Sequence, residues 1–350
     1  MTFRSALLLT LAVTFAGCSW QTGLQSDTPA MTRSTRATVE APVERPAAPD
    51  HPPERVDREL QNRLAEISQK ARSRVGIGAV MLETGDSAWV EREGRFATQS
   101  VYKLPIAMAA LRLVDSGRLR IDQQIQIAPE DYVRWGFQSP IRNQYPQGTY
   151  LPLGEIVRYS ISESDGSASD VLLDLAGGPE KVQQYLGEIG IRDFIVADST
   201  KAISKDWETQ FRNWATPRAS IDLLRAIIDR QAGLGEQTTN LLLGAMTEAH
   251  FGRRRLRRGL PKGAVLAHKT GTGGSQRGVT SVTADVGIIT LPDNRRILIA
   301  VYIENSPAGA WERNQMMADV AKAVCEKWYS EPDKESTRSE HVMYRPVSGL

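Results

Sequence analysis

A serine and a lysine stand three residues apart at the start of a helical stretch. Ser100 and Lys103 open an apolar run that continues to about Asp115. Residues at i and i+3 share a helix face, and the start of a helix adds positive potential. A serine hydroxyl needs a base to become a nucleophile, and a lysine with a lowered pKa can be that base. Alone, the pair is equally typical of a helix-capping serine followed by a surface lysine.

Two further polar motifs follow in a fixed order. Residues 162–166 read Ser-Glu-Ser-Asp-Gly before an apolar helical run, and residues 268–273 read His-Lys-Thr-Gly-Thr-Gly before a strand-rich segment. Ser164 lies 64 residues after Ser100, and Lys269 lies 105 residues after Ser164. Three ordered motifs are far more specific than any one of them.

Together these motifs resemble the Ser-x-x-Lys, Ser-Asp-Asn and Lys-Thr-Gly motifs of class A β-lactamases and penicillin-binding proteins. Residues 159–165, 260–263, 285–289 and 300–302 are similar to the segments that flank these motifs in class A enzymes, and residues 206–217 resemble the subgroup with an enlarged loop region. The likeness covers about residues 57–330. It implies an α/β (α+β) fold of the β-lactamase/transpeptidase type, in which helices flank an antiparallel sheet and an all-α lobe is inserted.

The resemblance also implies catalytic roles for four residues. Ser100 would attack the lactam carbonyl, and Lys103 would be the base of acylation or part of its proton network. Ser164 would relay a proton to the leaving nitrogen, and Lys269 would keep that relay polarised and attract the substrate carboxylate.

Five further residues are expected to bind substrate. Thr270 would hydrogen-bond the carboxylate, and the backbone N–H groups of Ser100 and Thr272 would form the oxyanion hole. The other three are Trp135 as an aromatic wall, Gly166 in the second motif and Arg277 as a second carboxylate contact. A packed tryptophan and an exposed strand arginine are equally good interpretations of Trp135 and Arg277.

Two positions depart from the class A pattern. Gly166 replaces the usual Asn of the second motif, which loosens substrate binding. Thr200 stands where a glutamate is expected to activate the deacylating water; the neighbouring acids are Asp198, Asp206 and Glu208. Loss of a general base slows a reaction by roughly 10²–10⁴-fold, so acylation is better supported than turnover.

Three functions therefore stand open. The favoured one is a serine β-lactamase that hydrolyses the β-lactam amide through a Ser100 acyl-enzyme. The alternative is a penicillin-binding or β-lactam-sensing protein, or a peptidase acting on peptidoglycan peptides, with slow deacylation. A non-catalytic surface lipoprotein is the third, and the intact motifs argue against it.

Composition excludes several other classes. The 350 residues carry 43 Lys+Arg and 41 Asp+Glu, a net charge of +2 that favours no nucleic-acid partner. The two cysteines and four scattered histidines form no metal-binding pattern, and no phosphate-binding loop is present, so neither a metal nor a cofactor is expected. The arginine-rich run at 253–258 is interpreted as a solvated face, and Cys325 as a core residue.

Local patterns predict the elements that position these motifs. Helical spacing predicts a helix from about Asp57 to Ala71 and a last helix over 311–328. Turn residues between β-rich runs predict hairpins over 75–91 and 279–304. The segment from about Ser100 to Arg230 is mostly helical, which places a helical lobe between strands contributed by both ends of the domain.

The N-terminal segment predicts that the protein is exported. Residues 1–17 have the charge and apolar length of a secretory signal, and Phe15-Ala16-Gly17-Cys18 resembles a bacterial lipobox with Cys18 as the lipidated residue. Residues 18–56 form a proline-rich linker, 57–330 the catalytic domain and 331–350 a flexible tail. We therefore expect a monomer held on the membrane by an N-terminal lipid and facing the periplasm or cell surface.

Overall fold

A computed structural model describes residues 50–329, and a mixed sheet forms the centre of this body. Its strands run in the order β1-β3-β2-β12-β11-β10, and β9 pairs with β11. Only β1 and β3 pair in parallel; the other pairs of this sheet are antiparallel. The strands of the described body are β1 Arg55–Val56, β2 Arg74–Met81, β3 Asp86–Val90, β4 Phe96–Ala97, β5 Gln124–Ile127, β6 Thr149–Pro152, β7 Phe194–Ile195, β8 Trp214–Ala215, β9 Val265–Thr272, β10 Ser275–Gln276, β11 Val279–Thr290 and β12 Arg296–Ser306.

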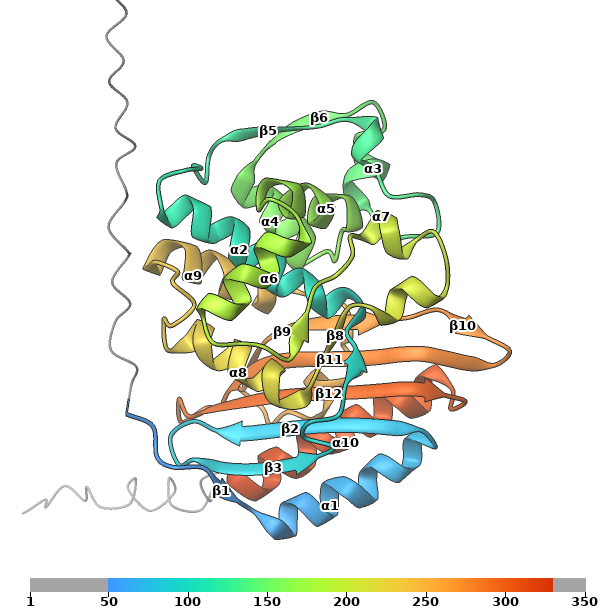
Figure 1. The fold of residues 1–350 in the computed structure, drawn as a ribbon. Helices are drawn as coiled ribbons and strands as arrows, with labels where there is room; N and C mark the ends of the chain where they lie inside the picture. Colours follow the sequence, from blue (N-terminus) through green and yellow to red (C-terminus); the bar gives the residue numbers. More distant parts are fainter. Residues whose placement is uncertain (1–49, 330–350) are drawn as a thin grey trace, which may run out of the picture. The chain divides into compact units, whose positions relative to one another are not determined.

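Helices cover both faces of this sheet (Figure 1). The α-helices are α1 Arg58–Ser68, α2 Lys103–Asp115, α3 Pro140–Gln144, α4 Leu153–Ile161, α5 Gly166–Leu175, α6 Pro179–Glu188, α7 Thr200–Ile203, α8 Pro217–Ile228, α9 Glu236–Glu248 and α10 Ala310–Trp328. Short 3₁₀ turns are η1 Gln69–Ala71, η2 Gln99–Tyr102, η3 Pro129–Asp131, η4 Glu208–Phe211 and η5 Leu256–Gly259.

The alternation of side chains along β12 creates two cores. Ile297, Ile299, Val301 and Ile303 pack with α1 and α10 on one face. Leu298, Ala300 and Tyr302 point to the other face, where they join α8 and the helical lobe. Successive side chains of a strand point to opposite faces, so one apolar strand buries residues on both sides.

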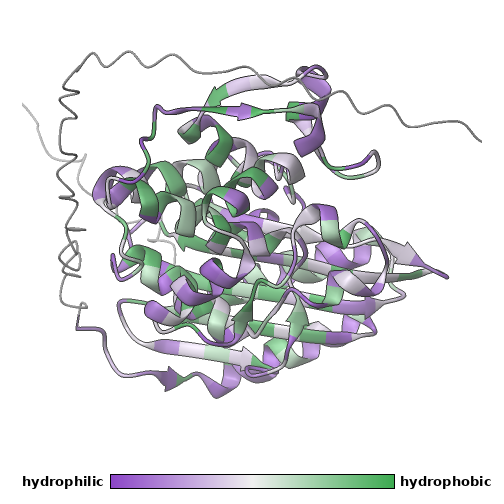
Figure 2. Cartoon of the chain, turned by 45° about the horizontal axis from the view of Figure 1, so that its top comes forward, coloured by the Kyte–Doolittle hydropathy of each residue, from purple (hydrophilic) through white to green (hydrophobic). Residues whose placement is uncertain are grey.

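The helical lobe is built around α2. Every residue from Lys103 to Leu111 is buried, and α4, α5, α6 and α9 contact this helix. In Figure 2 the hydrophobic residues gather on the facing sides of these helices, with polar residues toward the outside. The helix that follows Ser100 is thus held from several sides, so it forms a fixed support for the site.

The sequence predicts the main elements correctly. The two hairpins appear as β2–β3 and β11–β12, and the first and last helices as α1 with η1 and as α10. Strands from both ends of the domain meet in one sheet, with the helical lobe between them in the chain. The predicted antiparallel sheet flanked by helices, with an inserted helical lobe, is confirmed.

Two local features differ from the sequence-based description. Ser100 lies in the 3₁₀ turn η2, and the α-helix begins only at Lys103. Arg55 and Val56, assigned to the linker, form strand β1 beside β3. Residues 1–49 and 330–350, which include the signal segment, Cys18, most of the linker and nearly all of the tail, lie outside the described residues.

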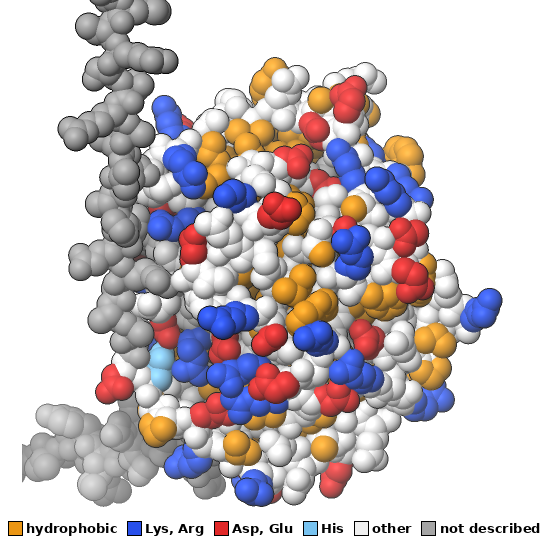
Figure 3. All heavy atoms as spheres, in the orientation of Figure 1, with side chains coloured by type: hydrophobic (Ala, Val, Ile, Leu, Met, Phe, Trp, Pro, Cys, Tyr) orange, Lys and Arg blue, Asp and Glu red, His pale blue; other side chains and the backbone are white. Residues whose placement is uncertain are grey.

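The charged groups of the body are mixed over its surface. Figure 3 shows Lys and Arg side chains interspersed with Asp and Glu across the face turned to the viewer. This distribution agrees with the balanced charge of the sequence. No helix within residues 50–329 is long and apolar enough to cross a membrane.

Candidate active site

A cavity of about 660 Å³ brings the three sequence motifs together. Ser100 and Lys103 reach it from η2 and α2, Ser164 from the turn before α5, and Thr272 from the end of β9. Residues far apart in the chain therefore line one space, as the resemblance implied. The rest of its lining comes from the loop 134–138, from α7, from the segment 206–210 and from the turn after β9 over 273–276.

Ser100 lies in a tight turn directly before the N-terminus of α2. It is half-buried, and the preceding residue, Gln99, has a left-handed φ of 46°. A left-handed non-glycine residue is strained and must be held by its surroundings. The Gln99 side chain donates a hydrogen bond to Gln210 Oε1 at 2.8 Å, which secures the turn. Strain at this point aims the serine into the cavity.

Lys103 is a buried lysine with a lowered pKa. Its side chain is 2% exposed, and its Nζ donates to the Ser164 carbonyl oxygen at 2.5 Å. Burial lowers the pKa of Lys103 to about 8, while the carboxylates of Asp165 and Asp170 oppose this shift. A lysine with such a pKa holds a substantial neutral fraction near neutral pH and can accept a proton.

Ser164 lies between the two lysines. Lys269 Nζ donates to Ser164 Oγ at 2.8 Å and to its neighbour's carbonyl, Thr270 O, at 3.2 Å. Burial, and then the charge of Lys103, hold the pKa of Lys269 well below its usual range. Ser164 has a left-handed φ of 53°, which turns its carbonyl to one lysine and its hydroxyl to the other. Lys103 therefore contacts the backbone of Ser164, while Lys269 contacts its hydroxyl and can exchange a proton with it directly.

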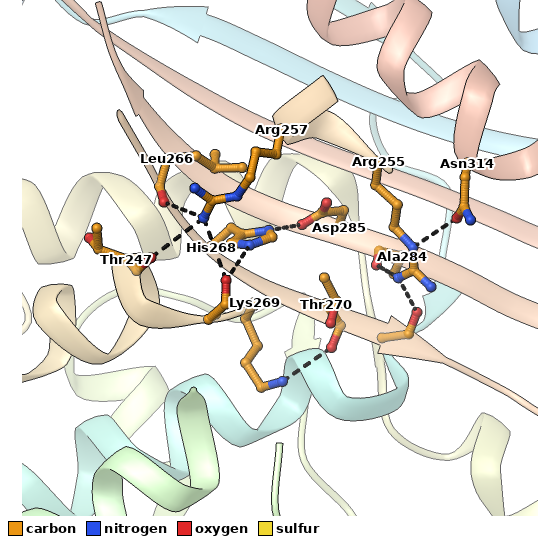
Figure 4. Close-up of polar contacts among 12 residues, drawn as sticks. Thr247, Arg255, Arg257, Leu266, His268, Lys269, Thr270, Ala284, Asp285 and Asn314 are labelled. Carbon is orange, nitrogen blue, oxygen red and sulfur yellow. Dashed lines mark hydrogen bonds and ion pairs between the residues drawn. The ribbon is translucent and has the colours of Figure 1, made fainter. Parts of the chain in front are cut away.

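Strand β9 presents different groups on its two faces. Figure 4 shows the Lys269 side chain extending away from His268, whose Nδ1 lies 2.7 Å from Asp285 Oδ1. Both members of the His268–Asp285 pair are fully buried. His268 therefore lies on the opposite face of β9 from Lys269, as expected for successive residues of a strand.

A buried arginine completes the substrate-facing end of β9. Arg255 donates to Thr272 Oγ1 at 2.7 Å, to Gly271 O at 3.0 Å and to Ala284 O at 2.8 Å. Figure 4 shows Arg255 beside Ala284. It is 8% exposed, so the interpretation of the whole 253–258 run as a solvated face is wrong for this residue. No sequence signal distinguishes it from Arg253 and Arg254, which are exposed. Arg255 adds a fixed positive charge behind Thr272.

Four of the five expected substrate-binding residues lie outside the cavity lining: Thr270, Trp135, Gly166 and Arg277. Thr270 does not line the cavity; it is buried, and its methyl group lies beside Gly252. Trp135 is 77% exposed and packs its ring under the Arg142 guanidinium at 4.1 Å; its neighbours Arg134 and Gly136 line the cavity instead. Arg277 is exposed in a left-handed turn between β10 and β11, outside the lining.

The two departures from the class A pattern touch each other. Thr200 lines the cavity, as the count along the sequence predicts. A Cβ added at Gly166 would come within 2.8 Å of Thr200 Cγ2 and 3.1 Å of Val133 Cγ1. Any larger residue at position 166 would therefore displace Thr200, so the two changes depend on one another.

The described cavity lining contains a single carboxylate, Asp206. It accepts hydrogen bonds from Thr209 N at 2.9 Å and Thr209 Oγ1 at 2.6 Å, and these bonds lower its pKa. Asp198 pairs instead with Arg212 at 3.2 Å and does not line the cavity. Neither acid takes the place of the expected glutamate.

Fold and site together indicate a serine enzyme of the acyl-transfer type, with buried lysines beside the predicted nucleophile. The sequence model of the Beta-lactamase enzyme family matches residues 58–328. The chain belongs to this family, and it is a class A serine β-lactamase.

Individual relatives agree with this assignment. Beta-lactamase VEB-1 of Pseudomonas aeruginosa is 34% identical over 266 residues, which cover 75% of this chain and 88% of that protein. Extended-spectrum beta-lactamase PER-1, also of Pseudomonas aeruginosa, is 34% identical over 231 residues, 66% of this chain and 74% of the relative.

Solved structures show the same fold. A beta-lactamase from Chitinophaga pinensis superposes with a TM-score of 0.75 at 34% identity, covering 77% of this chain and 99% of that one. The TLA-3 extended-spectrum beta-lactamase also gives a TM-score of 0.75, at 29% identity, covering 78% and 99%.

Proposed function

We propose that this β-lactamase works through an acyl-enzyme on Ser100. The observation that carries the proposal is the chain of contacts in one cavity: Lys103 Nζ on the Ser164 carbonyl and Lys269 Nζ on the Ser164 hydroxyl, beside Ser100. Neutral Lys103 takes the proton of Ser100, whose Oγ attacks the lactam carbonyl carbon. The backbone N–H groups of Ser100 and Thr272 stabilise the oxyanion, at about 3 kcal/mol for each donor.

Ser164 then protonates the leaving nitrogen. Its hydroxyl gives a proton to the lactam nitrogen as the amide bond breaks, and Lys269, which donates to that hydroxyl, resupplies the proton. The substrate carboxylate is held by Thr272, with Lys269 and Arg255 supplying positive charge behind it.

A substitution series tests the role of Ser100. S100A should lower the hydrolysis of a chromogenic cephalosporin by at least about a thousandfold, because no other group replaces the nucleophile. Ser116, at the far end of α2, supplies the matched control, and S116A should retain full activity. Equal activity of S100A and the unchanged protein would refute the acyl-enzyme on Ser100.

A second candidate function keeps acylation and reduces turnover. Thr200 in place of the expected glutamate supports a penicillin-binding, β-lactam-sensing or peptidoglycan-peptidase role with a long-lived acyl-enzyme. Intact-protein mass spectrometry separates the two: loss of a penicilloyl adduct within seconds favours the hydrolase, and an adduct that survives for hours favours the second function.

We also propose that the protein is an exported lipoprotein. Support comes from the sequence alone, in the apolar segment that ends at Phe15-Ala16-Gly17-Cys18 and the proline-rich linker after it. A linker of this composition gives the catalytic body reach from the membrane surface. The protein would face the periplasm or the cell surface, where β-lactams arrive.

A further inference from the structure

Deacylation needs a group that takes a proton from the attacking water. Asp206, the one carboxylate of the described cavity lining, accepts two hydrogen bonds from Thr209 that lower its pKa and make it a weaker proton acceptor. The position of the expected glutamate holds Thr200, whose hydroxyl is only a weak base by itself. A proton acceptor must therefore be reached through Thr200 or supplied by another element.

Thr200 is joined to a buried carboxylate on α5. Asp170 is 4% exposed and accepts the backbone N–H groups of Thr200 at 2.7 Å and Lys201 at 2.8 Å. The Thr200 side chain also helps to lower the pKa of this carboxylate, in agreement with its place beside Asp170. Burial raises the pKa of Asp170, although these hydrogen bonds and the charge of Lys103 oppose the shift. Asp170 is thus a better proton acceptor than an exposed aspartate.

Tyr102 contacts the Thr200 hydroxyl. Its Oη lies 2.7 Å from Thr200 Oγ1 in a fully buried position. Burial and the nearby Asp170 raise the pKa of Tyr102 far above its usual range, so the phenol keeps a proton that it can donate. When Tyr102 donates to Thr200 Oγ1, the Thr200 hydroxyl can direct its own proton to Asp170. One oxygen lone pair of Thr200 remains for a water molecule.

We propose that Thr200 binds the deacylating water and passes its proton to Asp170. The water oxygen attacks the carbonyl carbon of the Ser100 ester, and one water proton moves to Thr200 Oγ1 as the Thr200 proton moves to the Asp170 carboxylate. The tetrahedral intermediate then expels Ser100 Oγ. The proton returns from Asp170 through Thr200 to Ser100, which restores every group. Thr200 touches the reacting water, and Asp170 acts through Thr200 as a positioning residue.

Gly166 leaves the space that Thr200 needs in this proposed proton path. A side chain at this position would collide with Thr200 Cγ2, as shown above. The glycine therefore lets Thr200 approach both Tyr102 and the cavity. This inference rests on the proposed Ser100 acyl-enzyme and adds the route by which that acyl-enzyme is hydrolysed.

The test compares acyl-enzyme lifetimes in matched variants of the full chain. Each protein is mixed with benzylpenicillin, and formation and decay of the adduct on Ser100 are followed by mass spectrometry. T200V keeps the shape of the side chain and the backbone bond to Asp170 but removes the hydroxyl, and T200S restores the hydroxyl. D170N removes the carboxylate at nearly constant volume, and E208Q changes an exposed carboxylate outside the cavity lining.

We expect T200V and D170N to lengthen the adduct lifetime by at least about tenfold, with acylation rates within about threefold of the unchanged protein. T200S and E208Q should keep the original lifetime. If Asp170 only held the backbone of Thr200 in place, T200V would have an unchanged adduct lifetime, because that variant keeps the backbone contact. Unchanged lifetimes in T200V and D170N would overturn the inference, and so would a slowing produced by D206N alone. Absence of any Ser100 adduct would instead refute the proposed function.

Discussion

At the scale of single residues, burial decides what the site lysines can do. Lys103 and Lys269 are nearly inaccessible to solvent, and both lie against Ser164. Water would stabilise their charged forms, so its exclusion favours the neutral amine. The same two residues on an open surface would remain ammonium ions and could not take a proton from a serine.

The lowered pKa of Lys103 predicts the pH dependence of acylation. The amine accepts a proton only when neutral, and its neutral fraction rises as pH passes through about 8. The acylation rate should therefore climb about tenfold per pH unit well below this value and level off above it. Rapid-mixing measurements with a chromogenic cephalosporin would check this. A flat acylation profile from about pH 6 to 9 would contradict Lys103 as the base.

The contact between Gly166 and Thr200 predicts a non-additive pair of substitutions. G166A should lower the free energy of unfolding by about 1–3 kcal/mol, because its Cβ meets Thr200 Cγ2. T200S removes that methyl, so the same change should cost about 1 kcal/mol less in the T200S background. Urea unfolding of the four proteins measures this difference.

Gly187 supplies the control for that cycle. It lies in α6 with open space around its position, so G187A should not destabilise the protein. Strictly additive effects of G166A and T200S would show that the two positions do not constrain each other.

At the scale of elements, β9 is a strand whose two faces have separate tasks. One face carries Lys269 to Ser164, and the other carries His268 to Asp285 in the interior. Arg255 joins the two by bonding to carbonyl groups of β9 and β11 and to Thr272. The position of the substrate-facing edge therefore depends on polar groups buried behind it.

Removal of Asp285 should destabilise the protein strongly. D285A would leave the His268 ring and the Arg255 charge without their buried partner, at a cost of about 3 kcal/mol in the free energy of unfolding. D293A removes a carboxylate that pairs with Arg295 in an exposed turn, and should change stability by less than about 1 kcal/mol. Denaturant titration of both variants gives the comparison; equal effects would refute a special role for the buried pair.

The sequence predicts these elements better than it predicts the contacts between them. Both hairpins and the first and last helices follow from local periodicity, and the four predicted catalytic residues come from the resemblance of three motifs to those of class A enzymes. Arg255 could not be selected from six neighbouring residues that include five arginines, because only the fold buries one of them. The meeting of Gly166 with Thr200 joins residues 34 positions apart and has no local signal.

Trp135 shows a second limit of the sequence. The residue lies at the right distance along the chain for a cavity wall, yet its side chain packs on Arg142 outside the lining. The number of residues between two positions predicts roughly where the backbone of a loop residue lies. It does not predict where the side chain of that residue points. Orientation depends on the cation–π contact, which requires the folded loop.

At the scale of the whole molecule, different segments have different proposed functions. The described body contains the cavity, residues 1–17 are the proposed secretory signal, and Cys18 is the proposed lipid-attachment site. If Cys18 is lipidated, C18S should move the protein from the membrane fraction to the soluble fraction of the cells. The hydrolysis rate per molecule should stay unchanged, since the cavity is built from residues of the body. Retention of C18S in the membrane fraction would contradict the lipid anchor.

The central claim is that Ser100 becomes acylated and is then released by water, and one measurement tests it most directly. The full chain is mixed with benzylpenicillin, quenched at a series of times and analysed by intact mass and peptide mapping. We predict a penicilloyl adduct confined to the peptide that carries Ser100, which forms and then disappears as free penicilloic acid accumulates. No adduct on that peptide, together with unchanged penicillin, would contradict the account.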